Sequence, residues 1–417
     1  MRAETNPETT AATATANAPI YDVVVIGGGP SGATAAERLA KAGRSVLLID
    51  RAGRIKPCGG AIPPRLVRDF AIPDALLVAR IQGARIISPS GKQVAMPIEG
   101  GYVGMVDRED FDEYLRVRAA NAGAERATGT FEAIERDGAG AAVVRYRPKT
   151  VDADGRRDPV RVRARYVIGA DGARSNVGRQ EVKDGDKIPY VIAYHEIIKT
   201  PETAEDGAAF DGLRCDVVYR GSISPDFYGW VFPHGAKTSV GMGTGVDGVS
   251  LKSATAELRK ASGLEHAETV RTEGAPIPLK PLKRWDNGRD VVLAGDAAGV
   301  VAPASGEGIY YAMIGGELAA DACELALETG DAKALGTARK RFMKEHGRVF
   351  WVLGLLQWFW YSSDKRREKF VAMCADPDVQ RLTWESYMNK KLVRKDPMAH
   401  VRVFMKDMAQ LLGLARA

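Results

Sequence analysis

Near its start the chain reads Val23-Val24-Val25-Ile26-Gly27-Gly28-Gly29-Pro30-Ser31-Gly32. The four apolar residues predict a short buried parallel strand, and the glycines after them fit the pattern G-x-G-x-x-G. Gly27 permits a tight turn, Gly29 lets the backbone approach a pyrophosphate, and Gly32 lets a helix pack closely on the strand. The alanine-rich segment that follows predicts this helix, whose N-terminus offers free N–H groups and partial positive charge to phosphates.

A second strand and an acidic residue follow at the expected distance. Residues 46–49 read Val-Leu-Leu-Ile and predict another buried strand, which ends at Asp50, 18 residues beyond Gly32. A carboxylate at this place accepts hydrogen bonds from ribose hydroxyls. A G-x-G-x-x-G pattern alone also occurs in ordinary glycine-rich turns, but here strand, turn, helix, second strand and acid agree. The sequence therefore predicts a dinucleotide-binding domain.

The composition is that of a globular chain. Of its 417 residues, 45% are hydrophobic and 27% are charged, and 45 glycines indicate many special turns. The net charge of +6 is too small to indicate a nucleic-acid partner. The four cysteines form no C-x-x-C pair and favour a reducing compartment, while no His, Cys or carboxylate cluster has metal-ligand spacing. No uncharged run approaches the roughly 20 residues of a membrane span, so we expect a cytoplasmic protein.

Two further strand ends indicate which dinucleotide binds. Residues 166–172 read Tyr-Val-Ile-Gly-Ala-Asp-Gly, and residues 291–299 read Val-Val-Leu-Ala-Gly-Asp-Ala-Ala-Gly. Their order and spacing resemble the FAD-binding domain of the para-hydroxybenzoate-hydroxylase-like flavoproteins. In that resemblance Asp296 bonds the ribityl chain of FAD, and Arg108, within an Asp-Arg-Glu-Asp-Phe-Asp motif, contacts the cofactor. Only one dinucleotide fold is visible, so NADPH is expected to bind transiently as a co-substrate.

Three more motifs resemble those of the geranylgeranyl reductase family. Residues 56–60 read Lys-Pro-Cys-Gly-Gly, residues 228–233 match the pattern Y-x-W-x-F-P, and residues 300–309 resemble the family's flavin-ring loop and following helix. The resemblance runs from about residue 21 to residue 400 and is strongest to the branch acting in chlorophyll and bacteriochlorophyll synthesis. It implies an FAD-dependent reductase that hydrogenates three of the four double bonds of a geranylgeranyl group to give phytyl. The implied substrates are geranylgeranyl diphosphate, geranylgeranylated pigment or both.

The resemblance and the chemistry together assign roles to residues. An isolated alkene accepts hydride poorly, so reduction is expected to couple hydride from the flavin with a proton from the protein. Cys58 and Tyr228 are the candidate catalytic residues, as proton donors, directly or through water. His195 and His234 could also approach the flavin, although most such residues are structural. The residues expected to bind FAD are Gly27, Gly29, Ser31, Gly32, Asp50, Arg51, Cys58, Gly59, Gly60, Arg108, Asp171, Gly172, Gly295, Asp296, Pro303, Gly306, Gly308 and Ile309. Those expected to contact the substrate are Tyr228, Trp230, Phe232 and Pro233.

The expected fold class is α/β with an α+β second domain. It comprises a Rossmann-type FAD-binding domain, an inserted antiparallel β-sheet substrate domain and a helical C-terminal region. The expected boundaries are 1–19 for a disordered tail, 20–75, 105–180 and 280–330 for the FAD-binding domain, 76–104 and 181–279 for the substrate domain, and 331–417 for the helical region.

An aromatic stretch between Phe350 and Tyr361 has two interpretations. It predicts either a helix that covers the substrate domain or a patch resting on a bilayer, with Trp358 and Trp360 at headgroup level. The basic run Lys365-Arg366-Arg367 would then face anionic lipid. A peripheral location on the cytoplasmic or photosynthetic membrane, near other pigment-synthesis enzymes, would follow from the second interpretation.

Other functions remain open from the sequence. The same FAD scaffold also serves aromatic monooxygenases, and archaeal relatives reduce the isoprenoid chains of membrane lipids. A carrier of prenylated pigment with purely structural FAD is a non-enzymatic alternative. The motifs at residues 56–60 and 228–233 favour the reductase.

Overall fold

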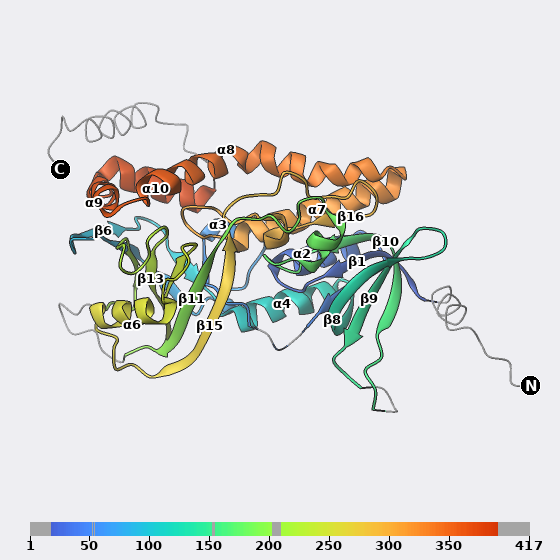
Figure 1. Cartoon of the computed structure of the whole chain (residues 1–417), viewed down its shortest axis with the longest axis horizontal. Coiled ribbons are helices and arrows are strands. Elements are labelled where there is room, and N and C mark those ends of the chain that lie inside the picture. Colours follow the sequence, from blue (N-terminus) through green and yellow to red (C-terminus); the bar gives the residue numbers. More distant parts are fainter. Residues whose placement is uncertain (1–17, 52, 54, 152–154, 202–209, 391–417) are drawn as a thin grey trace, which may run out of the picture.

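The computed structural model describes residues 18–51, 53, 55–151, 155–201 and 210–390. The tail expected at residues 1–19 lies outside this part of the chain except for its last two residues. Figure 1 shows two β-sheets side by side, with a layer of long helices across them. The expected α/β fold with an antiparallel second sheet and a helical C-terminal region is confirmed.

The first sheet is built around the glycine-rich turn. Its strands are β1 (Ile20–Ile26), β2 (Val46–Asp50), β8 (Glu125–Arg136), β9 (Ala142–Pro148), β10 (Val160–Gly169) and β16 (Val291–Leu293). β1 pairs in parallel with β2 on one side and β10 on the other, and β10 pairs in parallel with β16. β9 pairs antiparallel with both β8 and β10, so these three strands form a meander. All the glycine-rich strand ends therefore lie at the carboxyl edge of one sheet, where ligands bind in such folds.

Helices cover this sheet because its strands are apolar on both faces. Val23, Val24 and Val25 are fully buried. The covering helices are α2 (Pro30–Lys41), α4 (Arg108–Asn121), α5 (Asn176–Glu181) and α7 (Ile309–Thr329). α2 packs closely against both α4 and α7 (Figure 1). A helix from far along the chain, α7, therefore completes the covering of this sheet.

The second sheet has the order β15-β11-β14-β13-β12-β5-β6. Its strands are β5 (Gly83–Ile87), β6 (Gln93–Pro97), β11 (Tyr190–Lys199), β12 (Arg214–Val218), β13 (Gly229–His234), β14 (Lys237–Thr244) and β15 (Thr269–Pro278). Every pairing is antiparallel except β12 with β5, which run parallel. Helix α6 (Leu251–Ala261) covers one face. β14 contains Gly241 and Gly243, so this glycine-rich segment is a strand of the second sheet.

Smaller elements link the two sheets. β3 (Ala61–Ile62), β4 (Ala79–Ile81) and β7 (Val103–Met105) form a third sheet, next to helix α3 (Pro64–Asp69). Three short 3-10 helices lie at η1 (Asp74–Leu76), η2 (Gly295–Ala298) and η3 (Ala332–Gly336).

The chain continues through α8 (Thr337–Trp360), α9 (Asp364–Met373) and α10 (Pro377–Asn389). Among the described residues, no helix combines the length and apolar character needed to cross a membrane. The expected helical region also includes residues 391–417, which lie outside the described part of the chain.

The aromatic stretch on α8 divides between the core and the surface. Phe350, Trp360 and Tyr361 are buried, whereas Trp351 and Trp358 are 69% and 72% exposed. Trp360 was expected in the surface patch but is buried. Each residue along a helix rotates the side-chain direction by about 100°, so Trp360 points to the side opposite Trp358. One face of α8 therefore covers the protein and the other lies in solvent, and contact of this exposed face with a bilayer stays a prediction.

Candidate active site

The turn after β1 forms a cradle that is open above Gly29. Gly27 has φ 105°, and a side chain on Gly27 or Gly32 would overlap backbone carbonyl oxygens. Gly29 is the N-cap of α2, and a Cβ there would meet no atom within 4 Å. The helix N-terminus thus faces free space at the one glycine where a pyrophosphate has to approach.

Asp50 is fixed beside this turn. Its Oδ2 accepts a 2.7 Å hydrogen bond from the Gly28 amide. Arg116, on α4, donates to the Gly28 carbonyl at 3.1 Å and lies 4.0 Å from Asp50 Oδ1. Arg116 was missed from the sequence because no local motif marks it, and only the packing of α4 on α2 brings it here.

These residues fit a dinucleotide cofactor. The Ser31 hydroxyl is buried and has no hydrogen-bond partner in the described part of the chain. Such an orphaned donor at a helix N-terminus matches an anionic ligand. Together with the open space above Gly29 and the acid at Asp50, it leaves a site that fits the diphosphate and ribose of FAD.

Two loops from distant parts of the chain meet beyond the cradle. Gly295 follows β16 with φ 64° and packs against Ser31. The next residue, Asp296, is buried and forms an ion pair with Lys56 of the loop after β2, with Nζ and Oδ2 2.5 Å apart. The pair offers both donors and an acceptor where the ribityl chain is expected. Arg51, another expected cofactor residue, is exposed at the end of β2.

Asp171 lies in the turn before α5. Its oxygens accept bonds from the Ser175 hydroxyl at 2.5 Å and from the amides of Asn176 and Val177 at 2.7 and 3.2 Å. Burial raises the pKa of Asp171, although these bonds oppose the rise. Its carboxylate therefore stabilises the start of α5, while Gly172, with φ 91°, carries the turn.

Arg108 points toward Cys58. The buried guanidinium donates to both oxygens of Asp112, at 2.8 and 2.7 Å. Burial alone would lower the pKa of Arg108, but Asp112 and then Cys58 raise it. Cys58 Sγ also accepts a 3.4 Å bond from the Gly60 amide. The arginine thus supplies a fixed positive charge beside the thiol.

The flavin-ring loop is tied to the second sheet. Tyr228 donates a 2.6 Å hydrogen bond to the Ser305 carbonyl, and Phe227 stacks on its ring with centroids 4.2 Å apart. Gly306, with φ 64°, would place a Cβ 3.2 Å from the Tyr228 oxygen. Burial, more than any other cause, raises the pKa of Tyr228, so its phenol stays protonated.

Aromatic side chains form a wall on β13. The ring centroids of Tyr228 and Trp230 are 6.1 Å apart, and those of Trp230 and Phe232 are 6.3 Å apart. Strand alternation turns Pro233 to the opposite face. The Phe232 ring lies 3.0 Å from the position a Cβ on Gly59 would take. The wall therefore begins beside the Cys58 loop.

Helices α8 to α10 close the other side of the wall. Trp360, Tyr361 and Trp384 belong to the same apolar cluster as Tyr228 and Trp230. Tyr361 donates to the Ala304 carbonyl at 2.9 Å. The wall is thus part of a dry, largely aromatic interior.

A buried ion pair anchors α10 to the flavin-ring loop. Lys390 donates to Glu307, and both side chains are nearly inaccessible. The ammonium also lies 3.8 Å from the centre of the Tyr387 ring. Burial lowers the pKa of Lys390, opposed by Glu307. The neighbouring Gly308 is the N-cap of α7, whose first residue, Ile309, is buried.

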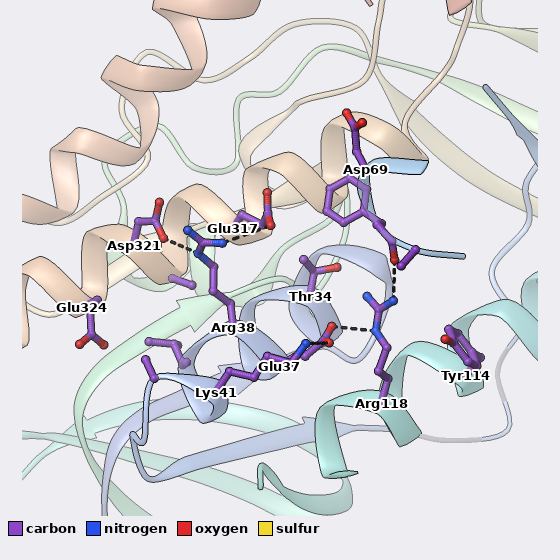
Figure 2. A pocket seen from close by; sticks show the side chains of 15 residues that line it. Thr34, Glu37, Arg38, Lys41, Asp69, Tyr114, Arg118, Glu317, Asp321 and Glu324 are labelled. Carbon is purple, nitrogen blue, oxygen red and sulfur yellow. Dashed lines mark hydrogen bonds and ion pairs between the residues drawn. The ribbon is translucent and has the colours of Figure 1, made fainter. Parts of the chain in front are cut away.

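A groove lies away from these residues, on the outer side of α2. It has a volume of about 680 Å³, and Figure 2 shows several of its charged side chains paired with one another. Arg38 contacts Glu317 and Asp321, and Arg118 contacts Glu37. None of the expected site residues lines this groove.

Comparison with known proteins gives consistent relatives. A family model described as lycopene cyclase protein matches residues 22–187. The chain is 59% identical over 394 residues to the geranylgeranyl diphosphate reductase of Rhodobacter capsulatus, which covers 94% of this chain and 98% of the relative. It is 38% identical to the chloroplastic geranylgeranyl diphosphate reductase of Oryza sativa, with coverage of 94% and 86%.

A crystal structure shares the fold. It is that of a geranylgeranyl bacteriochlorophyll reductase-like protein from Thermoplasma acidophilum, with a TM-score of 0.76 and 23% identity, covering 91% of this chain and 99% of that one. At this identity the likeness concerns the fold alone.

Proposed function

The chain belongs to the geranylgeranyl diphosphate reductase family, and on that premise we propose that it is an FAD-dependent reductase that hydrogenates C=C bonds of a geranylgeranyl group. The observation that carries the proposal is the hydrogen bond from Tyr228 to Ser305. It joins a buried aromatic wall, suited to a polyprenyl chain, to the loop expected beside the flavin ring.

The substrate is geranylgeranyl diphosphate, geranylgeranylated pigment or both, and the product is the phytyl form. NADPH is the proposed electron donor. Reduced FAD, when bound, supplies hydride to one alkene carbon. Tyr228, Trp230 and Phe232 orient the chain, and their dry surroundings keep out water that would trap the positive charge developing at this carbon as the other carbon takes up a proton.

Cys58 is the proposed proton donor in preference to Tyr228. The Tyr228 proton is already committed to the Ser305 carbonyl, and burial raises its pKa. Cys58 is only partly buried and lies beside the Phe232 end of the wall. The nearby Arg108 stabilises the thiolate left after proton transfer.

A single-turnover experiment tests the activity. Reduced holoenzyme is mixed without oxygen with geranylgeranyl diphosphate, and separately with geranylgeranylated pigment, and the products are weighed by mass spectrometry. We expect the mass of two hydrogens to be added per double bond while the flavin becomes oxidised. In a parallel reaction with oxygen, a product carrying an extra oxygen would identify a monooxygenase. If both compounds are recovered unchanged, the reductase is refuted.

Cys58→Ala tests the proton donor. We expect FAD to remain bound and flavin reduction to continue, while substrate-dependent flavin oxidation slows by about 10²-fold or more. Cys58→Ser keeps a poorer acid at the same place, so its rate of substrate-dependent flavin oxidation should lie between those of the original protein and Cys58→Ala. An unchanged oxidation rate in Cys58→Ala would remove Cys58 from the reaction.

We further propose that the exposed face of α8 rests on an anionic bilayer. Trp351, Leu355 and Trp358 are exposed at i, i+4 and i+7, and Lys344 and Arg348 continue the same face toward the helix start. Apolar rings with flanking cations suit the headgroup region.

Flotation with vesicles tests this surface. The protein should float with vesicles containing anionic lipid, and Trp351→Ala with Trp358→Ala should abolish flotation without changing the melting temperature. Leu325→Ala, an exposed apolar side chain on α7, is the matched control. Equal flotation of the double variant and the original protein would count against the surface.

A further inference from the structure

A narrow polar pocket reaches Cys58, and none of the aromatic wall residues lines it. It is lined by Cys58, Asp107, His234 and Lys237, among others. Its volume of about 10 Å³ is room for about one water molecule. Lys237 at its mouth is more than one-third exposed, whereas His234 is almost fully buried. The pocket therefore runs from solvent to the thiol.

His234 is placed to hold a mobile proton. Its Nε2 lies 3.0 Å from the Gly59 carbonyl, and its Nδ1 lies 3.3 Å from Asp107 Oδ1. The Gly59 carbonyl only accepts hydrogen bonds, so Nε2 carries a proton, whereas Nδ1 is buried and makes no aligned hydrogen bond within the described part of the chain. Lys237 contacts the other oxygen of Asp107 at 3.1 Å. The proximity of His234, followed by that of Lys237, lowers the pKa of Asp107 to about 2 despite burial.

The reaction makes a proton route necessary. Each double bond reduced takes up one proton from the protein, and the wall side has to stay dry. Once Cys58 has given its proton, a new one has to arrive by a path that does not wet the substrate. The pocket meets this requirement because Cys58 lines it and it has room for about one water molecule.

His195, the other buried histidine of the sheet, is unsuitable for this role. His195 Nδ1 lies 2.8 Å from Ser239 Oγ, which also accepts a 3.0 Å bond from the Trp230 indole. His195 Nε2 lies 2.9 Å from Glu273. His195 itself does not line the pocket, whereas His234 does.

We propose that this pocket is the proton-uptake route and that His234 recharges Cys58 through the pocket water. The Cys58 S–H bond breaks as a C–H bond forms at one alkene carbon, while hydride from reduced flavin forms the other. The thiolate takes a proton from the water, the water takes one from His234, and neutral His234 regains its proton from solvent past Asp107 and Lys237. This inference rests on the proposed function, and His234 acts through Cys58.

The test separates the two half-reactions in His234→Ala. We expect reduction of the bound flavin by dithionite to be unchanged. With dithionite in excess, so that the flavin is reduced again after each double bond, oxidation by geranylgeranyl diphosphate should slow at least tenfold from the second double bond onward. Added imidazole should enter the space left by the ring and restore part of the rate, with a pH dependence that follows free imidazole. The charged groups that also face the pocket, and that are unchanged in this variant, are Lys56, Asp107, Arg108, Lys237, Arg271 and Glu273.

Controls distinguish a relay from a structural role. His234→Gln keeps a hydrogen-bonding side chain that cannot carry a proton, so it should be as slow as His234→Ala but without imidazole rescue. Any loss in His195→Ala should not respond to imidazole. Lys199→Gln, on an exposed lysine outside the pocket, should leave both rates unchanged.

Two results would overturn the inference. One is a rate of flavin oxidation in His234→Ala equal to that of the original protein at every pH. The other is a loss in both half-reactions that imidazole does not relieve. If the original reduced enzyme is not oxidised by either geranylgeranyl substrate, the proposed function itself fails, and this inference with it.

Discussion

The hydroxyl of Tyr228 donates a 2.6 Å hydrogen bond to the carbonyl of Ser305, and this contact joins a strand of the second sheet to the loop before α7. This contact therefore fixes the distance between the aromatic wall and the loop expected to lie beside the flavin ring. The distance between hydride donor and alkene then depends on both sheets, since each supplies one side of the contact.

Tyr228→Phe should separate positioning from proton donation. It removes one hydrogen bond and leaves the Ser305 carbonyl unpaired, so we expect about 1–2 kcal/mol less stability. Substrate-dependent flavin oxidation should slow only a few-fold, much less than in Cys58→Ala. Stopped-flow oxidation and urea unfolding measure the two effects. A loss as large as that of Cys58→Ala would make Tyr228 the proton donor.

Gly29→Ala should prevent FAD binding without harming the apoprotein. A methyl group there meets no protein atom within 4 Å but occupies the space needed by the pyrophosphate. Gly32→Ala should instead destabilise the fold, because its methyl group would overlap the Gly27 carbonyl. Apoprotein melting temperature and FAD titration distinguish the two variants. Full FAD affinity in Gly29→Ala would place the cofactor elsewhere.

Removing one partner of the Lys390–Glu307 pair should be costly. Lys390→Met leaves the Glu307 carboxylate buried without its cation, so we expect a loss of about 3–5 kcal/mol of unfolding free energy. Lys390→Met combined with Glu307→Gln should recover much of this loss, because no buried charge remains. Urea unfolding of the two single variants and the double variant gives the coupling. Additive losses would show that the pair does not act as a unit.

Asp107→Asn should alter the pH dependence of stability. The pKa of Asp107 is about 2 in the folded protein and roughly 3.9 when unfolded. Its contribution is therefore fully present above about pH 4 and is lost as the pH falls toward 2. The difference in unfolding free energy between the original protein and the variant should be constant near neutral pH and shrink below about pH 4. A constant difference over the whole range would contradict the shifted pKa.

The fold and the cofactor turn were predictable because they depend on local chemistry. Gly27, Gly29 and Gly32 have roles that only glycine serves in a strand-turn-helix unit, so spacing alone reveals them. The alternation of Tyr228, Trp230 and Phe232 likewise predicts a shared face, because strand side chains repeat every second residue.

Long-range contacts could not be predicted in this way. Arg116 and Lys390 reach the site only through packing between elements far apart in the chain. Asp171 stays a predicted cofactor contact. Its motif carries that prediction, and three local donors also bind the carboxylate.

The parallel pairing of β12 with β5 has a consequence for how the protein is made. Residues 214–218 have to find residues 83–87 across most of the nucleotide-binding unit, and that unit in turn waits for α7 to pack on α2. The nucleotide-binding unit and the second sheet are therefore both incomplete when their first strands leave the ribosome. We therefore expect slow, cooperative folding with no independently stable fragment, and a late intermediate in which unpaired strand edges invite aggregation.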